Sequence, residues 1–292
     1  MGYKNKISKE QILESEIVKH LNEISRIGES RHEAKKIGEA SEHIYSIKTY
    51  EDYKQTMKVF AKYCIKNHPE IKHISDCKAF VAEYIGKMIE DMYSSYSQKS
   101  RLSCFRKFYS DRFEDVKTEG RVRSKIRRSR YDTANSRHFS EEANSQLIHF
   151  ARYTGLRRSE ISKLYGCTVS LHADGNYYID HVKGKGGRIR DVRILNNDQG
   201  VVDKINNTPA DQLVWPHVHS HADIHGYRAE YCRALYYSVA RDVSTLDKKE
   251  IYICRKDFAG VKLDREAMKI CSESLGHSRL GIISYSYWRP WY

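Results

Sequence analysis

The chain has few of the features that mark exported, membrane-spanning or disordered proteins. Proline is scarce, with 4 among 292 residues, and no stretch approaches the ~20 consecutive apolar residues that a membrane span needs. The N-terminus, MGYKNKISKEQ, lacks the apolar core of a secretory signal. Hydrophobic residues make up 40% of the chain, which argues against disorder. We therefore expect a folded, soluble protein that stays in the cytoplasm.

The cysteines show no sign of a disulfide framework. Their number, seven, is odd, and no two of them form a C-x-x-C motif. This usage favours a reducing compartment, so we interpret all of them as packing residues. They are Cys64, Cys77, Cys104, Cys167, Cys232, Cys254 and Cys271.

Positive charge is abundant and unevenly placed. Lysine and arginine number 51 against 38 acidic residues, a net charge of +13, and residues 1–130 hold 28 of these cations against 19 anions. The run RVRSKIRRSR holds six cations and no anion, so we expect a linker that binds a polyanion, with the phosphates of nucleic acid as the candidate. The alternative is a solvated loop without a partner. The six cations are Arg121, Arg123, Lys125, Arg127, Arg128 and Arg130.

Before this linker the apolar spacing is helical throughout. Ser8 and Gln11 form a capping-box pattern at the start of one helix, and Thr49 with Asp52 indicates the start of another. Residues 77–97 and 100–113 continue the helical pattern. We predict a small domain of four or five helices.

After the linker the pattern becomes mixed. A helix is expected from Ser140 over residues 140–152, and Tyr177–Leu195 gives two β-like runs around the glycine-rich turn GKGG. Further helices are expected at about 226–240, 264–275 and 279–288. The predicted fold class is α+β, mostly helical, with a small antiparallel sheet.

The segment TGLRRSEI is the first of four clusters that carry chemistry. Gly155 is expected to end a helix, and Arg157 and Glu160 follow at a spacing of one helical turn. An arginine held by a carboxylate can present a fixed fork to a phosphate. Taken alone, the pair is more often an ordinary surface ion pair.

The other three clusters are equally weak when each is taken alone. Lys185 stands at the tip of the glycine-rich turn, where a lysine is usually only solvated. His225 and Arg228 share a helical face in HGYR, a common arrangement on helix surfaces. His277 in SLGHSR precedes a tyrosine-rich tail and could simply cap a helix.

Together and in this order, the four clusters resemble the motifs of the tyrosine recombinase (phage integrase) family. TGLRRSEI resembles the family's first arginine box, VKGKGGRIR its hairpin lysine motif, HGYR its H-x-x-R box, and LGHSRLGIISYSYW its last histidine and tyrosine segment. The resemblance covers the chain from about Phe139 to its end. It implies cleavage of DNA through a 3′-phosphotyrosyl intermediate, without metal, ATP or another cofactor.

The resemblance also implies roles for the cations. Arg157 and Arg228 are expected to clamp the non-bridging phosphate oxygens, and Glu160 is expected to support Arg157. Lys185 is expected to protonate the departing 5′-oxygen.

The histidines and tyrosines complete the implied site. His225 would take the proton of the nucleophile, and His277 would bind the scissile phosphate. The position nine residues after His277, where the family's tyrosine usually stands, is a serine flanked by Tyr285 and Tyr287. We expect Tyr287 to attack, because SYW resembles the family's H-Y-L ending, and Tyr285 is the alternative.

Two intervals depart from the family pattern. Arg228 and His277 are 49 residues apart, about twice the usual spacing, so one or two inserted elements are expected around Asp247–Asp264. Only five residues follow Tyr287, whereas many relatives dock a longer tail onto a neighbouring subunit.

The implied organisation is that of a recombinase of a mobile element such as a phage. We expect an N-terminal helical extension (1–45), a helical core DNA-binding domain of the SAM-like type (46–120), the basic linker (121–135) and the catalytic domain (136–292). The expected partners are double-stranded DNA recombination sites, three further copies in a homotetramer, and accessory DNA-bending or excision factors.

Three other interpretations compete. A type IB topoisomerase would share the catalytic set, and a DNA-binding regulator could keep the fold without catalysis. A third reading is a metal site, because His217, His219, His221 and His225 crowd into PHVHSHADIHGYR, although no cysteine or acidic pair completes a familiar spacing.

Overall fold

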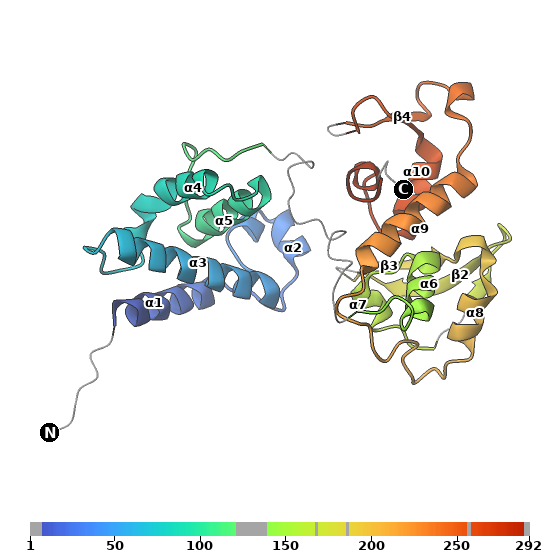
Figure 1. The fold of residues 1–292 in the computed structure, drawn as a ribbon, viewed down its shortest axis with the longest axis horizontal. Coiled ribbons are helices and arrows are strands. Elements are labelled where there is room, and N and C mark those ends of the chain that lie inside the picture. Colours follow the sequence, from blue (N-terminus) through green and yellow to red (C-terminus); the bar gives the residue numbers. More distant parts are fainter. Residues whose placement is uncertain (1–7, 121–138, 167–168, 185–186, 256–257, 289–292) are drawn as a thin grey trace. The chain divides into compact units, whose positions relative to one another are not determined.

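The computed structural model describes residues 8–120, 139–166, 169–184, 187–255 and 258–288. The chain forms two compact units, Met1–Arg127 and Arg128–Tyr292 (Figure 1), which we describe separately. The basic run 121–130 lies outside the described residues. None of the described helices is long and apolar enough to cross a membrane.

The first unit is helical. It contains α1 (Lys9–Glu23), α2 (Arg31–Lys36), α3 (Ile47–Asn67), α4 (Val81–Glu90) and α5 (Ser95–Phe108), with 3₁₀ turns at Glu39–Ser41 and Asp76–Phe80. One apolar core holds it together, built around buried side chains such as Leu13, Phe60 and Phe105. The predicted helical domain is therefore present, and α1 packs against α3 within it.

The helix boundaries in this unit follow capping side chains. The capping box of Ser8 and Gln11 is confirmed. The predicted start at Thr49 is wrong, because Ser46 caps α3 by accepting a hydrogen bond from the Thr49 backbone N–H at 3.2 Å. The helices expected at 77–97 and 100–113 are also divided differently. Met92 takes a positive φ of 56° after α4, and Ser94 caps α5.

The second unit is α+β, as predicted. Its helices are α6 (Ser145–Thr154), α7 (Arg158–Ile161), α8 (Gln199–Asn206), α9 (Ile224–Val239) and α10 (Arg265–Ser274), with 3₁₀ turns at Leu195–Asn197 and Val243–Thr245. Strands β1 (Val169–Leu171), β2 (Tyr177–Lys183) and β3 (Ile189–Arg193) form an antiparallel sheet in that order. A second hairpin, β4 (Ile251–Ile253) with β5 (Lys262–Asp264), occupies the long interval between HGYR and LGH.

Several details of this unit differ from the prediction. The helix expected from Ser140 begins at Ser145, and β1 and α8 were not foreseen. The helix expected at 279–288 covers 281–287 and ends in a π-helical turn, η9 (Ile283–Tyr287). Six of the seven cysteines are buried and unpaired by disulfides, as expected of packing residues, and Cys167 lies outside the described residues.

Candidate active site

Arg157 is placed by a tight turn between α6 and α7. Gly155 ends α6 with a left-handed φ of 59°, and its α-carbon lies so close to the Tyr231 ring that no β-carbon fits there. Two residues later, Arg157 stands at the N-cap of α7. Its backbone N–H and Nη1 donate to the Glu160 carboxylate at 2.8 and 2.6 Å. The predicted pairing of arginine and glutamate is therefore present.

Glu160 is the centre of a buried charge cluster. Besides Arg157 it accepts two hydrogen bonds from Arg190 of β3, at 3.2 and 2.9 Å, and lies 4.0 Å from Arg228. Burial alone would raise the pKa of Glu160, but the hydrogen bond and charge of Arg190 outweigh it, with help from the Arg157 backbone and from Arg228. The net effect lowers the pKa of Glu160 to about 2, so the carboxylate is charged at neutral pH.

Arg228 lies on α9 and is 1% exposed. Its Nη1 donates to the carbonyl of Gly155, and its Nη2 to the carbonyl of Leu275 at the end of α10. Arg157 Nη2 also donates to that Leu275 carbonyl, at 3.1 Å. Burial lowers the pKa of Arg228, although a guanidinium stays charged at any physiological pH. Two segments distant in sequence thus hold the two arginines side by side.

Tyr287 presents its hydroxyl to this cluster. Arg228 Nε donates to Tyr287 Oη at 3.0 Å, and His277 Nε2 lies 3.0 Å from the same oxygen. Because Arg228 uses a lone pair of Oη, the hydroxyl proton is available to His277. The ring of His225, one turn before Arg228, lies 5.4 Å from the Tyr287 ring centroid.

His277 is held neutral at its position. Burial, and then the charges of Arg228, Arg157 and Arg190, lower the pKa of His277 to about 4. Its backbone follows the end of α10, where Gly276 takes a left-handed φ of 67° and the His277 N–H donates to the Ser272 carbonyl at 2.7 Å. A neutral imidazole can accept a proton at pH 7.

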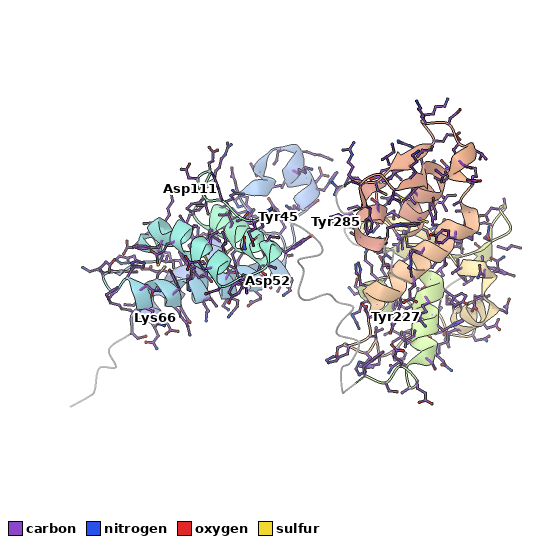
Figure 2. The ribbon with its side chains drawn as sticks, turned by 45° about the horizontal axis from the view of Figure 1, so that its top comes forward. Tyr45, Asp52, Lys66, Asp111, Tyr227 and Tyr285 are labelled. Carbon is purple, nitrogen blue, oxygen red and sulfur yellow. The ribbon has the colours of Figure 1, made fainter. Side chains whose placement is uncertain are left out.

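A cavity of about 940 Å³ opens onto the two arginines. Tyr287 and His225 line it, together with Arg157, Arg228 and the N-terminal end of α7, whereas Tyr285 is not among its lining residues. Tyr285 is half-buried on the same short turn and is labelled in Figure 2. The side chains gathered at this cavity can bind a phosphate and present a hydroxyl to it.

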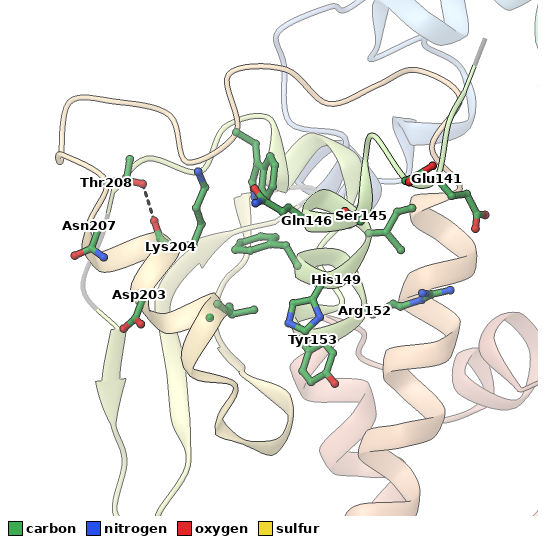
Figure 3. A pocket seen from close by; sticks show the side chains of 16 residues that line it. Glu141, Ser145, Gln146, His149, Arg152, Tyr153, Asp203, Lys204, Asn207 and Thr208 are labelled. Carbon is green, nitrogen blue, oxygen red and sulfur yellow. Dashed lines mark hydrogen bonds between the residues drawn. The ribbon is translucent and has the colours of Figure 1, made fainter.

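A larger cavity, about 1090 Å³, lies elsewhere in this unit, between α6 and α8 (Figure 3). It is lined by Phe150, Tyr153 and Trp215 with a mixture of acidic and basic side chains, and Lys204 Nζ lies 5.1 Å from the Trp215 ring centroid. It contains neither Tyr287 nor any of the three clustered arginines. We therefore place the chemistry in the smaller cavity.

The structure brings together most of the residues singled out in the sequence. Lys185 lies outside the described residues, as do the six cations of the basic linker. Gly184, directly before Lys185, borders the Arg190–Glu160 pair, since a β-carbon there would lie 2.9 Å from Arg190 Nη1. The predicted residues gathered at the site are Arg157, Glu160, His225, Arg228, His277 and Tyr287.

Arg190 is the member of the cluster that sequence reasoning missed. Its side chain is buried between α7 and α10, and its Nε donates to the Ser274 carbonyl at 2.8 Å. Strand alternation carried the signal, because Arg190, Val192 and Ile194 are buried whereas Ile189 and Asp191 are exposed.

The histidine-rich segment does not assemble a metal site. Where the structure describes the chain, the side chains with metal-ligand spacing are His172, Asp180 and Asp191 on the β1–β3 sheet, and no group of three comes from PHVHSHADIH. His219 and His221 instead lie ring to ring at 5.7 Å, and Phe139 packs 5.0 Å from His219.

Comparison with known proteins gives likenesses among solved structures. No family model matches the chain, and no curated protein matches it. Among solved structures, it is similar to residues 82–397 of the integrase of transposon Tn1549, solved in complex with circular intermediate DNA. That chain is 13% identical, with a TM-score of 0.38 over 80% of this chain and 95% of the other. We base the function on the side-chain geometry.

Proposed function

We propose that this protein is a site-specific DNA recombinase of a mobile element, which cuts and rejoins DNA through Tyr287. The observation that carries the proposal is the placement of the Tyr287 hydroxyl, hydrogen-bonded to both Arg228 and His277 beside Arg157. A tyrosine packed only for stability has no need of a buried guanidinium and a neutral imidazole at its oxygen, with a second arginine on the same cavity.

The chemistry follows from these side chains. Tyr287 Oη attacks the phosphorus as its proton passes to the neutral imidazole of His277, and the P–O5′ bond breaks. The products are a 3′-phosphotyrosyl link and a 5′-oxygen that Lys185 protonates. A 5′-hydroxyl of a second strand then reverses the step, so the energy of the phosphodiester bond is conserved.

The arginines supply the electrostatic stabilisation. Negative charge grows on the non-bridging oxygens in the transition state, and two preorganised guanidinium groups offset it. Glu160 keeps Arg157 in place, while burial fixes Arg228. We assign the proton of Tyr287 to His277, because His277 Nε2 lies 3.0 Å from the hydroxyl oxygen.

The remaining parts of the assembly belong to the same proposal. The helical unit and the basic run 121–130 bind DNA phosphates, four copies assemble on two double-stranded sites, and accessory DNA-bending factors set the direction of recombination. The reaction takes place in the cytoplasm of the host cell and uses neither metal nor ATP.

A nicked suicide substrate, cut from the DNA that flanks the gene, tests the proposal. The wild-type protein should form a covalent adduct that survives denaturing electrophoresis and protease digestion to a tyrosyl peptide. Tyr287→Phe should form none, while the matched variant Tyr285→Phe should retain adduct formation within about threefold.

The outcomes separate the alternatives. If Tyr285→Phe abolishes adduct formation and Tyr287→Phe retains it, the nucleophile is Tyr285. Binding of the site without an adduct favours a regulator, and relaxation of supercoiled plasmid without strand exchange favours a topoisomerase. Loss of strand transfer in the presence of EDTA would indicate a metal-dependent mechanism.

A further inference from the structure

The two consecutive arginines of TGLRRSEI have different partners. Arg157 belongs to the charge cluster around Glu160. Arg158, the first residue of α7, instead donates to backbone carbonyls of the segment 218–222. These carbonyls belong to Val218 and His219, which Nη1 contacts at 3.4 and 2.5 Å, and to Ala222, which Nη2 contacts at 2.5 Å. One guanidinium therefore joins α7 to a segment that lies 60 to 64 residues later in the chain.

The segment 218–222 contains neither helix nor strand and leads directly into α9. The Ala222 carbonyl, besides its bond with Arg158, accepts from the Ile224 N–H at 2.9 Å. Asp223 caps α9 by accepting from the Gly226 N–H at 2.9 Å. The backbone that Arg158 holds is thus the backbone from which the first turn of α9 begins.

Arg158 also connects two of the segments that line the smaller cavity. Residues of α7 line it, and so do residues 220–225, with Arg158 itself among the lining side chains. His225 stands in the first turn of α9. Arg228, one turn later, is held by two backbone carbonyls outside the segment 218–222. Loss of Arg158 should therefore displace His225 and leave Arg228 in place.

The charge of Arg158 is directed at the protein's own backbone. The side chain is half-buried, and burial lowers the pKa of Arg158 while the charge of Asp223 opposes this effect, so the guanidinium stays charged. Its planar fork places donors on two sides at once, which lets Nη1 and Nη2 contact different carbonyls. An apolar side chain makes none of these bonds, and the single ammonium of a lysine does not reproduce the fork.

We propose that Arg158 is a positioning residue, which fixes the segment 218–222 on α7 and thereby places His225 in the cavity beside Arg228 and Tyr287. This inference rests on the proposed function. In it, the imidazole of His225 faces the bound phosphate, and Arg158 contacts neither the DNA nor the tyrosine. Arg158 acts on the reaction only through the place that it gives to His225.

A double-mutant cycle on single-turnover adduct formation tests the proposal. His225→Ala should slow the reaction about 100-fold. Arg158→Met should slow it about 30-fold, because a misplaced imidazole is nearly as costly as a missing one. In the His225→Ala background, Arg158→Met should cost less than about threefold, since no imidazole is left to misplace. Lys163→Met removes an exposed charge just after α7 and is the matched control, expected to react within about twofold of its parent in both backgrounds.

An equal loss in both backgrounds overturns the proposal, because Arg158 would then act through Arg157 or through the fold. An unchanged rate for Arg158→Met overturns it as well. DNA affinity in a mobility-shift assay should stay within about threefold of wild type, and a larger loss with a weaker salt dependence would overturn the proposal by making Arg158 a phosphate contact. Arg158→Lys keeps the charge without the fork, and it repeats the cycle with a smaller loss if Arg158→Met does not fold.

Hydrogen exchange without DNA separates the positioning role from the reaction. If wild type forms no adduct, the proposed function fails, and exchange alone decides the positioning. The Gly226 amide, in the first turn of α9, should exchange at least about tenfold faster in Arg158→Met than in wild type or Lys163→Met. The Leu235 amide, later in the same helix, should be unchanged. Unchanged exchange at Gly226 rejects the positioning role, and so does an equal loss of protection at Leu235.

Discussion

The two units of this chain treat charge in opposite ways. Within residues 8–120 the buried polar side chains are Thr56, Ser95 and Gln98, none of them ionisable, and ion pairs such as Lys62–Glu10 lie on the surface. The second unit buries Glu160, Arg190 and Arg228 together. An apolar core is sufficient for stability. A buried charge cluster is costly to desolvate, so its presence indicates a functional site.

The largest expected effect comes from removing a buried charge next to Tyr287, the nucleophile that we propose. Arg228→Met should reduce the rate of adduct formation by about 10³-fold, because a preorganised donor of the transition state is lost. DNA affinity should change by less than about threefold in a mobility-shift assay at fixed salt. Arg152→Met, a surface arginine paired with Glu230, is the control. A tenfold loss or less would place Arg228 outside the chemistry.

The next effect is on stability. Glu160→Gln should destabilise the second unit by about 3 kcal/mol, because it leaves Arg190 and Arg228 buried without their counter-charge. All three tryptophans of the chain lie in this unit, so urea unfolding followed by tryptophan fluorescence reports on it alone. An unchanged midpoint would mean that the buried cluster contributes no more than a surface pair.

Acid should weaken the second unit more than the first. The pKa of His277, about 4, lies below its ordinary 6.5, so the unfolded chain takes up the proton first and stability falls as pH drops from 6.5 toward 4. With the partial exposure of the ring discounted, the loss between pH 7 and pH 5 should be about 1 kcal/mol. Glu160 adds a further loss as pH falls from 4.5 to about 2.

The variant His277→Asn should abolish the first part of this pH dependence, as measured by urea unfolding at pH 7 and pH 5. In the first unit, His73 makes stability depend on pH in the opposite direction. The Glu16 carboxylate raises the pKa of His73, so its contribution is present below pH 6.5 and is lost as pH rises through the raised value. A second unit equally stable at both pH values would contradict the neutral state of His277.

The smallest effect is expected at the surface of the first unit. Glu10→Gln breaks the pair with Lys62, whose side chains are 46% and 59% exposed, and should leave the exchange of amides in α1 and α3 unchanged. Protection lost in these helices would show that the first unit, too, depends on its charges.

Local signals in the sequence predicted much of the fold. The capping box at Ser8 and the helix end at Gly155 are set by side chains a few residues away, and both were correct. Thr49 failed as a start because Ser46, with the same capping chemistry, lies three residues earlier. The short elements β1 and α8 escaped because their stability comes from tertiary packing.

The sequence predicted only those residues of the site that lie within recognisable motifs. Arg190 stands in a strand between Ile189 and Asp191, and its role is visible only once its partner Glu160, thirty positions away, is known. The choice between Tyr285 and Tyr287 depends on which side of the helix each side chain faces. The π-helical turn of η9 has more residues per turn than an α-helix, so α-helical spacing does not predict these directions.

On the function that we propose, the bond between Arg228 and Tyr287 decides when the nucleophile becomes active. Each nitrogen of Arg228 already has a partner in the free protein: Nε the tyrosine hydroxyl, Nη1 the Gly155 carbonyl and Nη2 the Leu275 carbonyl. A phosphate oxygen that binds at Nε must displace the hydroxyl. Substrate arrival and release of the tyrosine are then a single exchange, and an unoccupied protein keeps its own nucleophile sequestered.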